Sequence, residues 1–245
     1  MTASPNPTST AISEGSMFAA VVNQYGSPDV FEYRTVDRPT LKPNQVLIKV
    51  HASSVNPIDW KIREGMLKIL PGQKFPMILG FDIAGEVVAI GSQVARFKIG
   101  DAVYAYSDQF PGGAYAEYAA VSEKVTAPKP QNLSYEEAAS VPLAAITALQ
   151  ALRDEAKLMA GQRVLINGAS GGVGTFAVQI AKALGAEAIA VCSAKNFELV
   201  KRLGADRVID YKQENFTQGT TKYNAIFDVI GNQSFSDCKS VLQPK

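Results

Sequence analysis

The chain contains little of the side-chain chemistry that builds disulfide scaffolds or zinc cages. It has two cysteines and one histidine in 245 residues, and Cys192 and Cys238 lie far apart with no CxxC spacing. A disulfide framework needs several paired cysteines, and a structural zinc site needs about four Cys or His ligands. Both classes are therefore disfavoured, and a reducing compartment fits the composition.

Excess charge of one sign and long apolar runs are also lacking. The sequence has 24 Lys and Arg against 23 Asp and Glu, so no net field attracts nucleic acid or an acidic membrane surface. No apolar run approaches the ~20 residues that span a bilayer, which predicts no integral membrane segment. Residues 1–16 carry no Lys or Arg and no apolar centre, unlike a signal or transit peptide. We therefore expect a cytoplasmic protein with a disordered tail over residues 1–16 and a small-molecule partner.

Residues 17–135 have the texture of a compact β domain. Short runs rich in β-branched and aromatic residues are separated by Gly and Pro, as in strands joined by turns. The expected strands cover 18–22, 45–50, 83–90 and 102–106. Helix signals are weak in this part, so the sequence predicts a mostly antiparallel β domain.

A junction is expected near Ser134, where the sequence becomes rich in alanine. Ser134 and Glu137 match a capping box at a helix start, and Pro142 interrupts the apolar stretch that follows, which predicts two helices. Over residues 136–245 strand-like and helical patterns alternate. The expected strands are 163–166, 188–192, 207–209 and 225–230, and the expected helices are 173–184 and 197–203. This alternation predicts parallel βαβ units in an α/β second domain.

A glycine-rich turn joins the first of these strands to the helix that follows. It contains Gly168, Ala169, Ser170, Gly171, Gly172, Val173 and Gly174. A dinucleotide fold needs small residues there because the backbone turns tightly, approaches a pyrophosphate and lets the helix pack on the strand. The amides at the positive end of that helix then face the phosphates. A merely flexible loop is the alternative, but the flanking strand and amphipathic helix favour nucleotide binding.

The residues around this turn are similar to one known family. Gly161, Gln162, the run 169–172, Gln179 and Lys182 resemble the signature of the zinc-free quinone oxidoreductase and zeta-crystallin branch of the medium-chain dehydrogenase/reductase family. Segments 54–59, 80–87 and 97–103 resemble the same family. The resemblance implies a GroES-like catalytic domain over residues 17–135 and a Rossmann NADPH-binding domain over residues 136–245.

The resemblance also implies that this chain is a C-terminally truncated member, because the family continues with further strands. The strand expected at 225–230 would then be an exposed apolar edge, which favours association, including a homodimer.

The residues after the second strand of the expected Rossmann domain favour NADPH over NADH. NAD-specific folds usually place an Asp or Glu about 20 residues past the glycines, whereas Ser193 and Lys195 occupy this place. Ser193 can donate a hydrogen bond to a 2′-phosphate, and Lys195 supplies a cation. Tyr211 resembles a family residue that contacts the same phosphate. Alternatively, Lys195 is an ordinary surface lysine.

The same comparison argues against a metal. Asn56 stands where zinc-dependent relatives carry their first Cys ligand, and Gly80-Phe81-Asp82 replaces their Gly-His-Glu motif. The single histidine, His51, lies on an expected strand and is best explained as a packed or half-exposed side chain. We therefore expect no metal, which disfavours alcohol oxidation and leaves reduction of an activated acceptor.

The expected reaction is hydride transfer from NADPH, in the cleft between the two domains, to a quinone or an activated enone or alkenal. By resemblance, Asn56 and Thr147 lie near the nicotinamide and the reacting carbonyl. Alternatively, Asn56 stabilises the turn before Pro57, and Thr147 bonds to its own helix. Trp60 and Lys61 line either the substrate entrance or the surface.

Two other functions stay open. Enoyl-thioester reductases of this family carry a Tyr shortly after the turn that holds Asn56, and residues 64–67 contain none. This weakens the thioester hypothesis and favours acceptors that take protons from water. A non-catalytic NADPH-binding protein, such as a sensor or a crystallin-like partner, would need the same glycine turn, so the sequence does not separate it from an enzyme.

Overall fold

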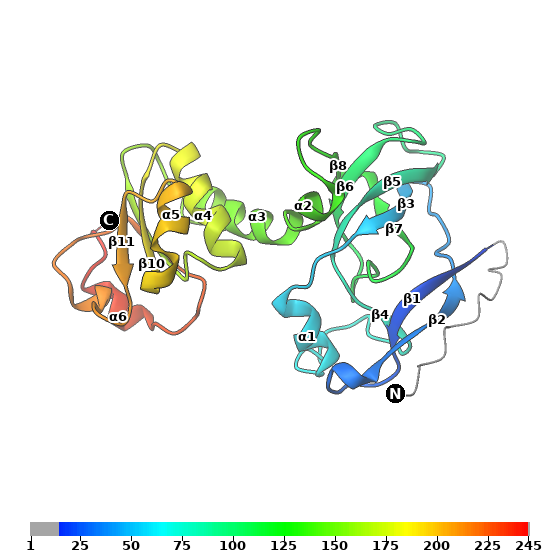
Figure 1. Ribbon diagram of the computed structural model, residues 1–245, viewed down its shortest axis with the longest axis horizontal. Coiled ribbons are helices and arrows are strands. Elements are labelled where there is room, and N and C mark those ends of the chain that lie inside the picture. Colours follow the sequence, from blue (N-terminus) through cyan, green and yellow to red (C-terminus); the bar gives the residue numbers. More distant parts are fainter. Residues whose placement is uncertain (1–14, 245) are drawn as a thin grey trace, which may run out of the picture. The chain divides into compact units, whose positions relative to one another are not determined.

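The computed structural model describes residues 15–244, and the chain divides into two compact units after Leu143 (Figure 1). The predicted tail lies outside the described residues except for its last two positions. Ser16, which was expected in the tail, is instead the first residue of β1 (Ser16–Val22) and is paired with Asp37.

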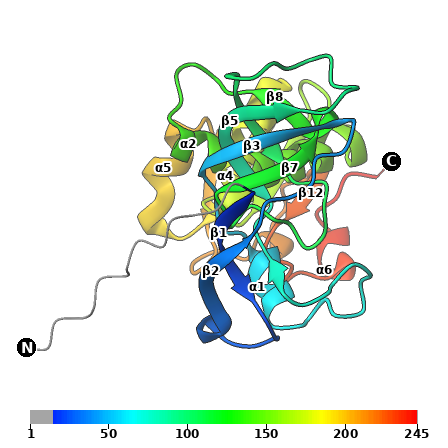
Figure 2. The ribbon, with the colours of Figure 1, turned by 90° about the vertical axis from the view of Figure 1, so that its right-hand side faces the viewer.

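The first unit contains two antiparallel sheets. One has the order β2-β1-β4, with β2 at Phe31–Asp37 and β4 at Met77–Ile78. The other has the order β7-β3-β5-β6-β8, and β3 lies between β7 and β5 (Figure 2). Its strands are β3 (Gln45–Ala52), β5 (Asp82–Ile90), β6 (Ala102–Tyr106), β7 (Tyr118–Ser122) and β8 (Thr126–Pro128). The predicted antiparallel β domain is therefore confirmed.

The core of the five-stranded sheet follows the two-residue period of its strands. Val46 and Ile48 of β3 and Ile83 and Val87 of β5 are fully buried in one cluster, because alternate side chains of a strand point to the same face.

One helix in this unit was missed by the sequence prediction. α1 (Pro57–Arg63) begins directly after Asn56, which is its N-cap. Pro57 has the fixed φ that suits the first helical position, and the Asp59 carboxylate accepts the Asn56 backbone N–H at 2.7 Å. Seven residues give only about two turns, too few for an apolar period to stand out.

Two helices follow at the junction, as predicted from Pro142. They are α2 (Tyr135–Ala139) and α3 (Pro142–Leu149), and a π-helical segment (Gln150–Glu155) continues α3. Ala138 and Ala139 of α2 pack against Ala84 of β5. Because of this packing α2 belongs to the first unit, and the division falls after Leu143 rather than near Tyr135.

The second unit is built on a parallel four-stranded sheet with the order β11-β10-β9-β12. Its strands are β9 (Arg163–Asn167), β10 (Glu187–Cys192), β11 (Arg207–Asp210) and β12 (Ala225–Asp228). Its helices are α4 (Gly172–Ala183), α5 (Phe197–Arg202) and α6 (Phe235–Lys239). The predicted alternation of strands and helices is confirmed.

Both faces of this sheet are covered. Val164 and Ile166 of β9 pack in the cluster that contains α4 and α5, which lie beside β10 in Figure 1. Leu165, between them, packs on the opposite face in the cluster that contains Cys238 of α6. Burial on both faces explains why these strands appear in the sequence as continuous apolar runs rather than alternating ones.

β12 lies at one edge of the sheet, and all four of its side chains are half-buried. Tyr223, just before β12, donates its N–H to the Val241 carbonyl at 2.8 Å and accepts the Gln243 N–H at 2.9 Å. The start of the expected apolar edge is thus covered by a later segment of the chain.

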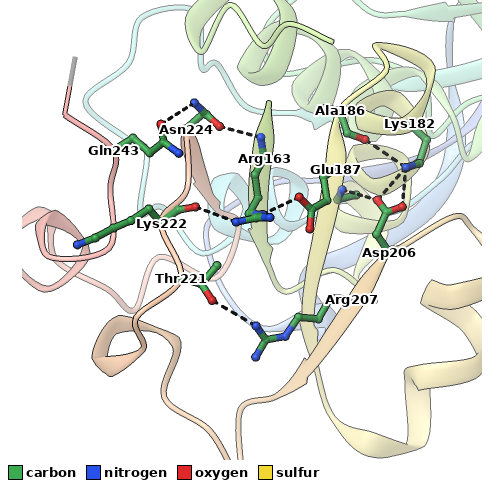
Figure 3. A network of polar contacts seen from close by, with 11 residues as sticks. Arg163, Lys182, Ala186, Glu187, Asp206, Arg207, Thr221, Lys222, Asn224 and Gln243 are labelled. Carbon is green, nitrogen blue, oxygen red and sulfur yellow. Dashed lines mark hydrogen bonds and ion pairs between the residues drawn. The ribbon is translucent and has the colours of Figure 1, made fainter. Parts of the chain in front are cut away.

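Charged side chains tie the amino ends of these strands together (Figure 3). Arg163, which starts β9, donates Nε–H to Glu187, which starts β10, at 2.7 Å. The Lys182 ammonium binds both oxygens of Asp206 at 2.7 and 2.8 Å, and Asp206 also accepts the Ala188 N–H at 2.8 Å. These charged groups therefore pair with one another at the amino edge of the sheet. The opposite, carboxyl edge is where parallel sheets of this kind bind ligands.

Candidate functional site

The glycine turn after β9 has a backbone that only glycine suits at two positions. Gly168 has φ +84°, and a Cβ there would lie 2.7 Å from Cδ1 of Ile230. A Cβ on Gly174 would lie 2.1 Å from the Gly168 carbonyl oxygen. The first turn of α4 therefore rests directly on the backbone at the end of β9, which is the close approach that a dinucleotide turn requires.

The start of α4 is open to an anion. Its N-cap, Gly171, has no side chain to cap the helix, and both Gly171 and Gly172 are exposed. The first amides of a helix have no partner within the helix, and the helix dipole makes this end positive. This 12-residue helix thus presents donors suited to a phosphate group.

A cavity of about 670 Å³ lies at the carboxyl edge of the sheet, beside this turn. Its volume is in the range of small-molecule sites, about 300–1,000 Å³. It brings together five residues predicted to bind the cofactor: Ser170, Gly171, Ser193, Lys195 and Tyr211. The turn, the end of β10 and the segment after β11 therefore converge on one site.

A smaller hollow of about 250 Å³ is lined by Ser193, Lys195, Tyr211, Lys212 and Asp210, together with Ala194. Two ammonium groups thus stand against a single carboxylate. Asp210 is also occupied locally, since it accepts the Lys212 N–H at 3.0 Å. The balance of charge in this hollow favours an anionic group of phosphate size.

The other predicted turn residues shape the site without lining the cavity. Ala169 is fully buried, Val173 packs against the core beneath α4, and Gly174 forms the close contact with Gly168. Gly172 is exposed at the helix start. These four positions set the path of the backbone.

Two asparagines that line the cavity were not predicted. Asn167 ends β9, and its Nδ2 donates to Asp228 at 2.8 Å and to Asn232 at 2.9 Å. The Asn196 Nδ2 donates to the Ser170 hydroxyl at 2.9 Å. A polar residue directly after a buried run is the signal that could have identified Asn167, whereas Asn196 follows the exposed Ala194 and Lys195 and carries no such signal.

In the first unit, the structure places Asn56 in a buried polar cluster. The Asn56 Nδ2 donates to Asp82 Oδ2 at 2.7 Å and to the Ser54 hydroxyl at 3.1 Å. The Ser54 hydroxyl in turn donates to Asp82 Oδ2 at 2.5 Å. Only 9% of Asn56 is exposed, so its amide is held in one orientation.

A second carboxylate completes this cluster. Asp59 Oδ2 accepts the Tyr115 hydroxyl at 3.0 Å, in addition to the Asn56 backbone N–H, while Asp59 Oδ1 is buried without a hydrogen-bond partner. Burial raises the pKa of Asp59, and the nearby charge of Asp82 adds to this effect. Burial also raises the pKa of Asp82.

The remaining predicted residues lie on helices. Thr147 is exposed on α3 and belongs to the second unit. Trp60, on α1, is 38% exposed, and the Lys61 ammonium lies 5.6 Å from the centre of its ring. This contact is a cation–π pair.

Comparison with known proteins agrees with this architecture. Residues 42–131 match the family model described as alcohol dehydrogenase GroES-like domain, and residues 172–245 match the one described as zinc-binding dehydrogenase. A chloroplast envelope quinone oxidoreductase homolog of Arabidopsis thaliana is 46% identical over 202 residues, covering 80% of this chain and 61% of the relative. A 2-methylene-furan-3-one reductase of Solanum lycopersicum is 43% identical, covering 91% of this chain and 60% of the relative.

A solved quinone oxidoreductase from Coxiella burnetii has the same fold, with a TM-score of 0.78 and 38% identity over 88% of this chain and 69% of that one. A GroES-like β unit followed by a dinucleotide-binding sheet defines a two-domain dehydrogenase class. The chain belongs to the quinone oxidoreductase branch of the medium-chain dehydrogenase/reductase family. It spans about three fifths of the length of the Arabidopsis and tomato relatives.

The described residues do not fit the zinc ion named in the second family model. The ring of His51 stacks on Tyr135, with centroids 4.4 Å apart, and Cys192 and Cys238 are buried in the second unit. Residues 15–244 contain no group of three or more His, Cys, Asp or Glu placed to hold a metal. The same part of the chain has no helix with the length and apolar character needed to cross a bilayer.

Proposed function

We propose that this chain carries the NADPH site and the acceptor-reducing residues of a zinc-independent oxidoreductase that reduces a quinone or an activated enone or alkenal. The observation that carries the proposal is the cavity at the carboxyl edge of the sheet, which joins the glycine turn to Ser193, Lys195 and Tyr211. The names of a quinone oxidoreductase homolog and an enone reductase among the relatives support this substrate class.

In this proposal the backbone around Ala169, Ser170, Gly171, Gly172, Val173 and Gly174 binds the pyrophosphate. The Gly172 amide, the first of α4, lies at the positive end of the helix and donates to the pyrophosphate oxygens, while the Gly171 N–H donates to the Gly168 carbonyl at 3.0 Å and fixes the turn. Ser193, Lys195 and Tyr211 hold the 2′-phosphate in the smaller hollow. NADPH fits better than NADH because no carboxylate takes the place of Ser193 or Lys195.

When bound, NADPH supplies the hydride. Asn56 and Thr147 are the residues proposed to contact the nicotinamide and the acceptor. Asn56 suits this role because its amide is already fixed by Asp82 and Ser54, so little ordering is needed when ligands bind. A cytoplasmic location and a homodimer stay predictions from the sequence.

The test is a panel of acceptors with NADPH, followed by the loss of NADPH absorbance. It is run on this chain and on a version extended to the length of the relatives. We expect consumption with quinones or alkenals. Consumption with enoyl thioesters alone would favour a thioester reductase, and tight binding without consumption would favour a non-catalytic NADPH-binding protein. Calorimetry that detects neither reduced dinucleotide at millimolar concentration would refute the proposal.

Lys195→Ala tests the choice of cofactor. A hydrogen bond to a charged group contributes about 1.5–3 kcal/mol, so the variant should bind NADPH about 10- to 100-fold more weakly. NADH affinity should not change, because NADH has no 2′-phosphate. Lys201→Ala is the control, since Lys201 is an exposed lysine on the neighbouring α5. Equal weakening of NADPH and NADH binding would contradict the assignment.

A further inference from the structure

Asp82 is a fully buried carboxylate with an unusually complete set of partners. It is the first residue of β5 and is 0% exposed. Within residues 15–244 it forms no ion pair. Instead it accepts three hydrogen bonds, from the Ser54 hydroxyl, the Asn56 Nδ2 and the Leu143 backbone N–H, at 2.5, 2.7 and 2.7 Å.

These three donors come from three different segments. Ser54 lies in the stretch that follows β3, Asn56 is the N-cap of α1, and Leu143 is the second residue of α3. The Leu143 N–H is one of the first amides of α3, which have no partner within the helix. A single carboxylate thus bonds directly to Asn56 and to the Leu143 amide at the start of α3.

We propose that Asp82 is a positioning residue for the reduction, acting through the Asn56 side chain. The inference rests on the proposed function, in which Asn56 contacts the nicotinamide and the acceptor. Asp82 itself is 0% exposed, so its proposed role is to orient the Asn56 side chain.

The physical reason is the cost of a buried charge. A carboxylate without a cation stays ionised inside a protein only if several donors surround it. Burial raises the pKa of Asp82, and the Ser54, Asn56 and Leu143 donors oppose that rise. Each donor is therefore held in place, because the buried carboxylate needs its hydrogen bond. The Asn56 amide cannot rotate without leaving Asp82 short of a partner.

The chemistry also explains why Asp is needed at this position. In Asp82→Asn, one oxygen becomes an NH₂ group, which cannot accept a hydrogen bond. That group would face either the Asn56 and Ser54 donors or the Leu143 N–H, so one of the two attachments is lost. In Asp82→Glu, an extra methylene would enter a fully buried site.

The experiment compares Asp82→Asn, Asn56→Ala and the double variant in the full chain. Misplacing a positioned group by about 1 Å costs on the order of 100-fold in rate, so single-turnover hydride transfer should fall by about 10- to 100-fold in each single variant. The double variant should lose little more, because both changes remove the same interaction. Calorimetric affinity for NADPH should fall less than fivefold, since the phosphate site lies in the second unit. Asp101→Asn is the control, because its carboxylate bonds only within the turn at Lys98.

A second readout does not depend on turnover. The Asn56 side-chain NH₂ signals and the Leu143 amide are followed by NMR and hydrogen exchange. Asp82→Asn should shift the Asn56 signals or speed exchange at Leu143. If Asp82→Asn does not fold, Ser54→Ala takes its place, and it should shift the Asn56 signals without unfolding the chain. Additive rate losses, or unchanged Asn56 and Leu143 signals in folded Asp82 and Ser54 variants, would overturn the proposal. If no acceptor consumes NADPH, the proposed function fails, while these signals still decide whether Asp82 fixes Asn56 and α3.

Discussion

Alanine at Gly174 should destabilise the second unit, whereas alanine at Gly172 should not, although both glycines lie in the first turn of α4. The added Cβ at position 174 would lie 2.1 Å from the Gly168 carbonyl oxygen and 2.7 Å from the Ala169 Cα. Both are backbone atoms, so the turn or the helix must move. At position 172 no atom lies within 4 Å of the added Cβ.

The expected magnitude follows from two opposing effects. Alanine is favoured over glycine inside a helix by about 1 kcal/mol. Overpacking of a close contact costs about 1–3 kcal/mol. The helix preference is common to both variants, so the difference between their free energies of opening reports the close contact at Gly174 alone. Because 2.1 Å is far inside normal van der Waals separation, we expect a difference of about 3 kcal/mol, at the top of that range.

Hydrogen exchange at the β9 and β10 amides is the appropriate assay. The chain has two units, so a single two-state unfolding free energy is not assured, and exchange reports the opening free energy of this sheet directly. NADPH affinity, measured by calorimetry, should fall with Gly174→Ala because the turn moves; Gly172 serves as a control for stability only. Equal opening free energies for the two variants, within about 0.5 kcal/mol, would refute the reasoning about the close contact.

Two further predictions concern carboxylates with shifted pKa values. Burial raises the pKa of Asp59 above its ordinary value of 3.8, so the stability that protonated Asp59 contributes is present below pH 3.8 and is lost as pH rises through the pKa of the folded state. Asp59→Asn removes this loss, so its unfolding free energy, followed by Trp60 fluorescence, should rise more steeply with pH than that of the unaltered chain, by up to about 1.4 kcal/mol per pH unit. An unchanged slope would contradict the argument that Asp59 is a buried acid. Partial burial works to raise the pKa of Asp206, but the hydrogen bonds from Lys182 and the Ala188 N–H outweigh it and lower the pKa below 3.8. Its stabilisation is thus present at neutral pH and lost as pH falls, and because both side chains are more than a third exposed, Asp206→Asn should cost only about 0.5–1 kcal/mol at pH 7 and nothing near pH 2, as measured by exchange at β10.

The sequence was most informative where one segment carries the whole signal. Strands β9 to β12 are short apolar runs bounded by helices, and the glycine turn is contiguous, so both were predicted within a residue or two. Ser193 and Lys195, which line the cavity, could be predicted because their distance from the turn is fixed by one helix and one strand. Helix α1 was missed because its stability comes from a capping interaction and from packing rather than from a period.

The rest of the site depends on contacts between distant segments. Asn167 meets Asp228, 61 residues later, only because β12 pairs with β9 in the sheet. Asp82 likewise meets Leu143 only because α2 packs on β5 and brings the start of α3 beside it. A single sequence does not reveal such partners, since strand order and helix docking determine them.

The ion pairs of Arg163 with Glu187 and of Lys182 with Asp206 lie one full strand length from the cavity beside the glycine turn. The paired charges and the cavity thus lie at opposite edges of one small sheet. Substitutions that alter these charges should therefore change the stability of the sheet, by about 1 kcal/mol at most, without altering the lining of the cavity.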